Sequence, residues 1–458
     1  MVNRKAALAV LLAVLLMVVG TVGAQDTVPV VSFMTTFGGS ELDGLRNSLD
    51  AFTAETGIQV IVESNRQLVP ILRTRLAGGS PPDLALIPQP GLLAEFARAG
   101  YLVPLVNEDG SAGLIDAATL SDNYAQGIID LGNVDGTQYG ILAKANSKST
   151  IWYSPESLAA LGLETPTTWD ELIAIQQAYI DAGLIPWSIG GADSWTLTDW
   201  FENIYVRQNG PEAYQQLFVT HEIPWTDASV TAALDSFRQI VDPADTHLAG
   251  GVDGTLSTDF ITAANMVFRP DPAAEMYYEG GFMGGIIASN FPDLVPVTDF
   301  NAFLFPAISE EVGAPVVGGG DLLAAFADRP EVAALVAWMA GVEGNTLWAG
   351  APTGAVVSPR PVHSEKLLRR LTAHRVAALQ AELLDRPDVA VAALTAHLAQ
   401  KVLRDALPGA YRSANVLAIS ATDNLHELRS AAEDIEASAA GAGRRVGSNS
   451  RCSASSSP

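Results

Sequence analysis

The chain has 458 residues, of which 48% are hydrophobic and eight are tryptophan, so it can bury more than one sizeable core. Its formal net charge of −25 argues against nucleic acid or an anionic membrane surface as a partner. A single cysteine, Cys452, excludes an internal disulfide.

A secretory signal peptide is predicted over residues 1–24. The basic residues Arg4 and Lys5 precede an apolar run over residues 6–19, and small side chains then lead up to the polar Gln25. The alternative is an uncleaved membrane anchor, because a tight span needs only about 17 residues. No cysteine lies directly after the apolar run, so a lipid anchor is not expected. We therefore expect an exported protein, periplasmic or extracellular, that is not a lipoprotein.

Strand and helix patterns alternate over residues 30–87. Short β-branched and aromatic runs predict buried strands at residues 30–34, 58–62 and 84–87. Between them, leucines spaced by three and four residues predict two helices, the first of which ends at Gly57. Strands joined through helices imply an α/β fold with a parallel sheet and right-handed crossovers.

A ligand crevice is expected at the carboxyl ends of these strands. Open sheets of this kind bind ligands beyond the ends of the strands, where successive loops meet. The residues at those ends are Thr36-Phe37-Gly38-Gly39, Ser64-Asn65-Arg66 and Gln89.

A second lobe is expected to begin near Ile141, after the turn-rich residues 135–138. Within it, Thr168 and Glu171 have the spacing of a reciprocal capping box, which predicts the start of a helix. Glycines cluster later, at residues 279–285 and 316–321, and these segments are predicted to be loops. Missing side chains let the backbone approach a ligand there, although tight turns alone also explain them.

Aromatic side chains gather between residues 187 and 225. Trp195 is expected in a Ser-, Thr- and Gly-rich loop and is a candidate for ligand binding, whereas Trp200 and Tyr205 are assigned to the core. Apolar rings flanked by carboxylates and amides suit a sugar, because its C–H faces pack on rings while its hydroxyls need fixed donors and acceptors. The alternative is an aromatic-rich core without a ligand.

The order and spacing of several short stretches resemble family 1 extracellular solute-binding proteins, and within them the α-glucoside-binding type. The resemblance covers about residues 30–361. Its stretches are Thr53 with Glu55-Thr56-Gly57, Gly79-Ser80-Pro81-Pro82-Asp83, Pro186-Trp187-Ser188-Ile189-Gly190, Leu197-Thr198-Asp199-Trp200-Phe201-Glu202, His221-Glu222-Ile223-Pro224 and Gly318-Gly319-Gly320-Asp321-Leu322.

This resemblance implies a two-lobed fold of the periplasmic-binding-protein type II kind. Residues 25–140 and about 290–361 are expected in the first lobe, and residues 141–289 in the second, mostly helical lobe. The two lobes are expected to close about a hinge on a sugar and to present it to the permease subunits of an ABC importer. No cofactor, metal or nucleic acid is expected, contact with the membrane is expected only through the permease, and the protein is expected to be a monomer.

The candidate ligand-binding residues are distributed over both expected lobes. They are Phe37, Gly38, Glu41, Asn65, Arg66, Gln89, Asn146, Trp195, Asp199, Phe282, Met283, Gly319 and Asp321.

The last 96 residues differ in composition from the rest of the chain. Residues 363–458 carry 12 Lys or Arg against 10 Asp or Glu, whereas residues 1–362 carry 14 against 41. The stretches 369–375, 386–390 and 418–422 resemble the helical C-terminal portion of a plasmid-partitioning ParB-type protein. We therefore expect a helical tail over residues 363–440 that makes the chain a fusion, with a divergent binding-protein ending as the alternative. The small polar residues from 441 to 458 are predicted to be disordered.

Two further classes of function compete with ligand binding. A secreted glycoside hydrolase would need two carboxylates flanking a sugar, and Asp199 with Glu202 is the available pair, but such spacing is more typical of a solvated helix face. The sequence holds none of the usual nucleophile-elbow, zinc or phosphate-loop motifs, and its histidines lack metal-ligand spacing. The third class, a partition-related nucleic-acid protein, rests on the tail alone.

Overall fold

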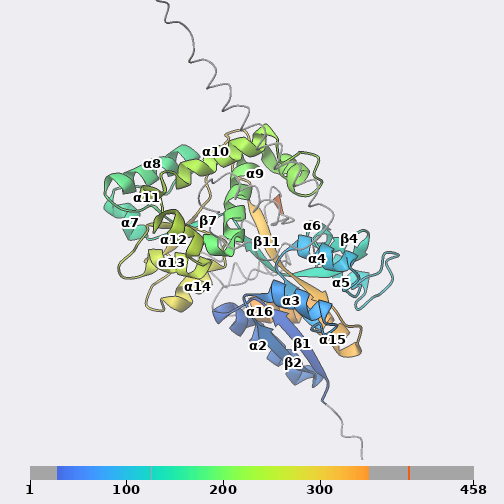
Figure 1. Ribbon diagram of the computed structural model, residues 1–458. Coiled ribbons are helices and arrows are strands. Elements are labelled where there is room, and N and C mark those ends of the chain that lie inside the picture. Colours follow the sequence, from blue (N-terminus) through green and yellow to red (C-terminus); the bar gives the residue numbers. More distant parts are fainter. Residues whose placement is uncertain (1–27, 125, 350–389, 392–458) are drawn as a thin grey trace, which may run out of the picture.

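The computed structural model describes residues 28–124, 126–349 and 390–391. The two larger β-sheets lie in separate lobes. Figure 1 shows the green and yellow helices of the second lobe on one side and the blue and orange elements of the first lobe on the other. Among the described residues, no helix combines the length and the apolar character that crossing a bilayer requires.

The first sheet contains the three strands expected near the N-terminus. β1 (Val30–Thr35) pairs in parallel with both β2 (Gln59–Ser64) and β3 (Leu84–Ile87). The long strand β11 (Val317–Ala325) pairs antiparallel with β3 and with β6 (Gly140–Ser147). The predicted parallel α/β core is therefore confirmed, and two antiparallel strands extend it.

Helices cover both faces of this sheet because neighbouring strand residues point to opposite sides. Phe33 joins one buried apolar cluster and Met34 the other. The helices of this lobe are α2 (Gly39–Thr56), α3 (Leu68–Ala77), α4 (Pro90–Arg98), α5 (Ala117–Ser121), α6 (Gln126–Asp130), α15 (Pro330–Ala340) and α16 (Val342–Ala349), accompanied by the hairpin of β4 (Asn133–Val134) and β5 (Thr137–Gln138). Gly57 ends α2 in the left-handed conformation, as predicted.

The second sheet has the order β10-β7-β9-β8. Its strands are β7 (Thr150–Tyr153), β8 (Trp187–Ser188), β9 (Met276–Tyr278) and β10 (Asn301–Leu304). Its helices are α7 (Pro155–Ala160), α8 (Trp169–Asp181), η2 (Gly191–Asp193), α9 (Trp195–Phe218), α10 (Ala228–Val241), α11 (Ala244–His247), α12 (Gly251–Ser257), α13 (Phe260–Phe268) and α14 (Met283–Asn290).

The local predictions for this lobe hold at two points. Thr168 accepts a hydrogen bond from the backbone N–H of Glu171, and Glu171 accepts one from the backbone N–H of Thr168, so the capping box forms. Trp200 and Tyr205 are buried in the aromatic core of this lobe, as expected. The long helix α9 departs from helical geometry at Gly210, which precedes Pro211.

Both expected lobe boundaries are corrected by strand pairing. Ile141 lies inside β6, which pairs with β11 in the first sheet, so the chain leaves that sheet only after Ser147. The boundary near residue 290 is also too early, because β10 pairs with β7 in the second sheet. Strand partners are tertiary contacts, and turn-rich sequence does not reveal them.

Two further expectations are corrected by β11 and its neighbours. Gly318, Gly319 and Gly320 lie in a strand and not in a loop, and the missing side chain of Gly320 lets β11 approach β6 closely. In the tail, Ala390 and Val391 form the short strand β12, which pairs in parallel with β11 where a helix was expected, since the edge of β11 offers backbone partners there. The rest of the ParB-like segment, the signal peptide and residues 441–458 lie outside the described residues.

Candidate functional site

A cavity of about 440 Å³ is lined by residues of both lobes. Its walls combine aromatic rings, carboxylates, amides and three cations. The lining residues are Thr36, Phe37, Glu41, Arg66, Val69, Pro88, Gln89, Lys144, Asn146, Lys148, Asp193, Trp195, Asp199, Asp259, Phe260, Ile261, Phe282, Gly320 and Asp321.

One wall is built from the carboxyl ends of the parallel strands, where the crevice was expected. Phe37 follows β1, Arg66 follows β2 and Gln89 follows β3 as the residue preceding α4. The backbone N–H of Phe37 donates to the Thr35 hydroxyl over 3.2 Å, and the Ser64 hydroxyl donates to the Phe37 carbonyl. These bonds fix the loop that carries the first aromatic ring.

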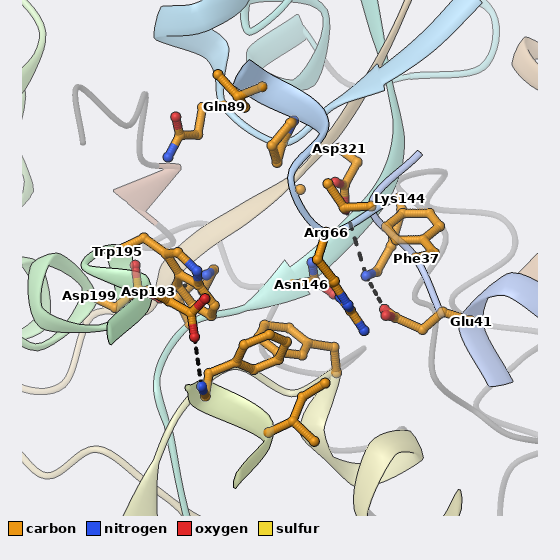
Figure 2. Close-up of a pocket in the computed structure, with 18 of the residues that line it drawn as sticks. Phe37, Glu41, Arg66, Gln89, Lys144, Asn146, Asp193, Trp195, Asp199 and Asp321 are labelled. Carbon is orange, nitrogen blue, oxygen red and sulfur yellow. Dashed lines mark hydrogen bonds and ion pairs between the residues drawn. The ribbon is translucent and has the colours of Figure 1, made fainter. Parts of the chain in front are cut away.

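The opposite wall comes from the start of α9. Figure 2 shows Asp193, Trp195 and Asp199 grouped on one side of the cavity, with Phe37, Glu41, Lys144 and Asp321 on the other. Trp195 is the first residue of α9, not a loop residue as expected, and its ring packs against Phe260 and Phe282. Asp193 accepts a 2.7 Å hydrogen bond from the backbone N–H of Phe260, which ties η2 to α13.

Lys144 lies in the first wall as a buried cation held by two carboxylates. Its ammonium donates to Glu41 of α2 and lies 3.8 Å from a carboxylate oxygen of Asp321 in β11. Burial raises the pKa of Asp321, and the neighbouring Lys144 opposes that rise. The strands β6 and β11 are directly paired at Lys144 and Asp321, so the sheet itself brings the two groups together.

Lys148 places a second ammonium in the cavity from the segment that joins β6 to β7. It donates to Asp199 over 2.7 Å, and both residues are at most 8% exposed. Burial alone would lower the pKa of Lys148, but the carboxylates of Asp199 and Glu279 outweigh burial and raise it. For Asp199 the effect of burial is the opposite: burial raises its pKa, and the attraction of Lys148 only partly offsets that rise.

Glu202 lies one helical turn beyond Asp199 and is not solvated. It is 1% exposed, accepts a 2.8 Å hydrogen bond from the Tyr214 hydroxyl and does not line the cavity. Burial and the nearby Asp199 raise the pKa of Glu202 to about 8. The expected solvated helix face is therefore wrong, because α9 is enclosed by the second lobe along its first turns.

Nine of the thirteen candidate residues line the cavity, and four do not. Gly38 precedes α2, where a Cβ would lie 3.5 Å from the Arg66 guanidinium, and the Asn65 side chain instead accepts a hydrogen bond from Gln67 within its own turn. Met283 is fully buried in an apolar cluster of the second lobe. Gly319 contributes no lining, whereas Gly320, one position along β11, does.

Sequence reasoning missed Lys144, Lys148, Asp193, Asp259 and Phe260. For the two lysines a signal was present, because they interrupt a strand and its extension that are otherwise apolar or small, and buried lysines are rare unless paired. For Asp193, Asp259 and Phe260 no local signal stands out, since they meet the cavity only through the packing of η2 on α13.

Two α/β lobes that both line a polar and aromatic cavity define a class of protein, the two-lobed solute receptor. Among the described residues, no group of three His, Cys, Asp or Glu is arranged to hold a metal ion. The chain belongs to the bacterial extracellular solute-binding proteins, whose family pattern matches residues 38–346.

Relatives agree with this assignment, and a solved structure shares the fold. The chain is 35% identical over 355 residues to the osmoprotective compounds-binding protein GgtB of Synechocystis sp., covering 77% of this chain and 80% of that protein. It is 33% identical over 323 residues to the alpha-glucosides-binding periplasmic protein AglE of Rhizobium meliloti, covering 67% and 68%. In fold it is similar to the GacH receptor of Streptomyces glaucescens, with a TM-score of 0.65 at 15% identity over 83% of this chain and 92% of that one.

Proposed function

We propose that this chain is the exported substrate-binding component of an ABC importer, which binds an α-glucoside or another small oligosaccharide and delivers it to the permease subunits. The protein acts as a monomer and reaches the membrane only through the permease. It carries out no chemistry on the ligand.

The composition of the cavity wall carries this proposal. Four aromatic rings from both lobes stand beside carboxylates and two amides, Gln89 and Asn146. Rings pack on the C–H faces of a sugar, and fixed oxygen and nitrogen atoms satisfy its hydroxyls. The volume of about 440 Å³ falls within the range of roughly 300–1,000 Å³ typical of small-molecule sites.

The printed names of the relatives support the same class of ligand. AglE is named for α-glucosides and GgtB for osmoprotective compounds, and both align over two thirds or more of their own lengths. Export follows from the predicted signal peptide at residues 1–24 together with the extracellular family.

Glycoside hydrolysis is the competing function, and the arrangement of Asp199 and Glu202 argues against it. A hydrolase needs two carboxylates that face each other across the scissile bond. Asp199 is engaged by Lys148, while Glu202 is bound by Tyr214 and lies outside the lining of the cavity. The pair therefore lacks a second carboxylate that can reach a bound sugar.

A thermal-shift and calorimetric screen of the chain from Gln25 onward tests the proposal. Maltose, trehalose, sucrose and other small saccharides are added in turn, and a binding ligand raises the melting temperature in line with RT ln(1 + [L]/Kd). We expect one saccharide or a related group to shift the melt without release of reducing sugar. A cooperative melt that no saccharide moves would refute the carbohydrate assignment, and catalytic release of reducing sugar would favour the hydrolase.

A further inference from the structure

Every aromatic ring that lines the cavity has a cation of the protein itself over or beside it. The Lys144 ammonium lies 4.5 Å from the centre of the Phe37 ring and 5.5 Å from that of Phe282. The Lys148 ammonium lies 4.4 Å from Trp195 and 5.3 Å from Phe282. The guanidinium carbon of Arg66 lies 5.2 Å from the Phe260 ring.

Carboxylates hold the two ammonium groups in these positions. Lys148 is paired with Asp199 at 2.7 Å, and Lys144 with Glu41 and Asp321. The side chain of Lys148 is 10% exposed and that of Lys144 is 3% exposed, so both are held in place by the surrounding protein. The ring faces are therefore occupied by positive charge as a built feature of the site.

This arrangement separates two classes of small ligand. A quaternary ammonium compound has no N–H group and is bound by placing its cation on bare aromatic faces. Here it would meet rings that already carry a cation, at the cost of repulsion between like charges. An uncharged polyol or sugar brings acceptor oxygens instead, and an ammonium has three N–H donors, of which the described hydrogen bonds of Lys148 use one, to Asp199.

The remaining charges do not favour an anionic ligand. The lining holds three cations, Arg66, Lys144 and Lys148, against the five carboxylates of Glu41, Asp193, Asp199, Asp259 and Asp321. No surplus of positive charge is available to compensate an added negative charge. The excess of carboxylates would by itself attract a cation, so the exclusion of quaternary ammonium compounds rests on the occupied ring faces and not on the net charge of the lining.

We propose that Lys148 is a specificity-determining residue, whose ammonium, seated on Trp195 and held by Asp199, makes the cavity select an uncharged polyhydroxylated ligand and exclude quaternary ammonium compounds. The inference rests on the proposed carbohydrate function and narrows it. Lys148 is suited to this role because its backbone is fixed on both sides. Its N–H donates to Val317 of the first lobe over 2.8 Å, and its carbonyl accepts from Asn203 and Tyr278 of the second.

The test is calorimetric titration with the saccharide selected by the screen and, separately, with choline and glycine betaine. We expect the unmodified protein to bind the saccharide and neither ammonium compound. Lys148→Met keeps an unbranched side chain of similar length without charge, and it should weaken saccharide binding about tenfold or more, as expected for loss of a charged hydrogen-bond donor. The same variant should gain choline binding, because it bares the Trp195 face next to Asp199.

Lys148→Arg is the matched control, because it retains the positive charge over Trp195 and should still exclude choline. The inference is overturned if the unmodified protein binds choline or betaine as well as the saccharide, or if Lys148→Met leaves both affinities unchanged. The titration of the unmodified protein needs no substitution, so it can overturn the inference even if Lys148→Met does not fold. If the unmodified protein binds no saccharide at all, it is the proposed function that fails, and the inference falls with it.

Discussion

At the scale of single residues, the chain concentrates buried polar side chains where it passes from one sheet to the other. Ser147, Lys148, Ser149 and Thr150 are all at most 8% exposed. The Ser149 hydroxyl donates to the Asn203 side chain over 2.6 Å and accepts from the backbone N–H of Val317 over 2.9 Å. Polar groups buried this deeply need partners, and here the partners come from both lobes.

Trp195 is the residue for which a direct loss of binding is expected. Trp195→Ala should weaken saccharide binding by more than about 1 kcal/mol, because aromatic contacts supply energies of that order. The variant should still melt cooperatively, since the ring is only half-buried at the start of α9. The affinity is measured by calorimetric titration.

Trp225→Ala provides the matched control for this substitution. Trp225 is also half-buried, but it packs on Phe201 and Phe218, away from the cavity lining. We expect its saccharide affinity to be unchanged. Equal affinities for Trp195→Ala and the unmodified protein would show that Trp195 does not contact the ligand.

Glu202 predicts a pH dependence of stability. Its pKa is raised from 4.5 to about 8 in the folded protein, so between these values the native state keeps a proton that the unfolded state releases. Stability from this group is fully present below the unfolded pKa and is lost as pH rises through the folded pKa. Glu202→Gln, which cannot ionise, removes this dependence and keeps an acceptor for Tyr214.

The measurement is denaturant unfolding of the unmodified protein and of Glu202→Gln at several pH values without ligand. As the pH rises from about 5 to about 8.5, the free energy of unfolding of the unmodified protein should fall by on the order of a few kcal/mol relative to that of the variant. The reason is that one pKa unit corresponds to about 1.4 kcal/mol. Glu279 titrates in both proteins, whereas removal of the Glu202 charge also changes the titration of the neighbouring Asp199, so the difference reports Glu202 together with its coupling to Asp199. Parallel pH profiles would contradict a raised pKa.

At the scale of elements, β11 shows why a glycine-rich segment is a strand. The segment pairs with β3 on one edge and β6 on the other, with a register shift between Asp321 and Leu322. A Cβ on Gly320 would lie 2.0 Å from the carbonyl oxygen of Lys144. The glycine is therefore required by close approach of two strands, which also sets the position of Asp321 in the cavity.

Gly320→Ala is expected to disturb both stability and the site. The added methyl group would force β11 away from β6, at a cost in the range of about 1–3 kcal/mol typical of overpacking. Saccharide affinity should fall as well, because Lys144 and Asp321 are displaced from one another. Chemical unfolding and calorimetric titration measure the two effects.

Gly127→Ala is the control for a glycine without such contacts. No atom lies within 4 Å of a Cβ built on Gly127, which is in α6, and alanine is a better helix former. This variant should be at least as stable as the unmodified protein, with unchanged affinity. If Gly320→Ala behaved in the same way, the close approach of the two strands would not constrain that position.

At the scale of the whole molecule, the cavity is completed only when both lobes contribute. Phe37, Arg66 and Lys144 come from the first sheet and its loops, whereas Trp195 and Phe260 come from the second lobe. Ligand that contacts both walls stabilises the closed arrangement over an open one. We expect a saturating saccharide to reduce the radius of gyration measured by small-angle X-ray scattering.

A saccharide that gives no thermal shift serves as the control for this experiment, because it should leave the scattering curve unchanged. An identical radius of gyration with and without a bound saccharide would show that binding does not require movement of the lobes.

Elements whose signals are local could be predicted from the order of the residues. These elements depend only on residues close by in the chain. They are the strands β1, β2 and β3, the apolar face of α2 with its end at Gly57, and the capping box of α8. The position of the crevice at the carboxyl ends of the strands followed from parallel topology, and Phe37, Arg66 and Gln89 line the cavity there.

The tertiary structure alone decided what depends on contacts between distant segments. The lobe boundaries were set by the partners of β6 and β10, and the burial of Glu202 by the lobe that encloses α9. The placement of cations over the aromatic rings also depends on contacts between distant segments, because Lys148 and Trp195 are 47 positions apart in the chain. Hydrophobic periodicity indicates which face of an element is apolar. It does not indicate which distant segment packs against that face, because pairing depends on contacts between segments far apart in the chain.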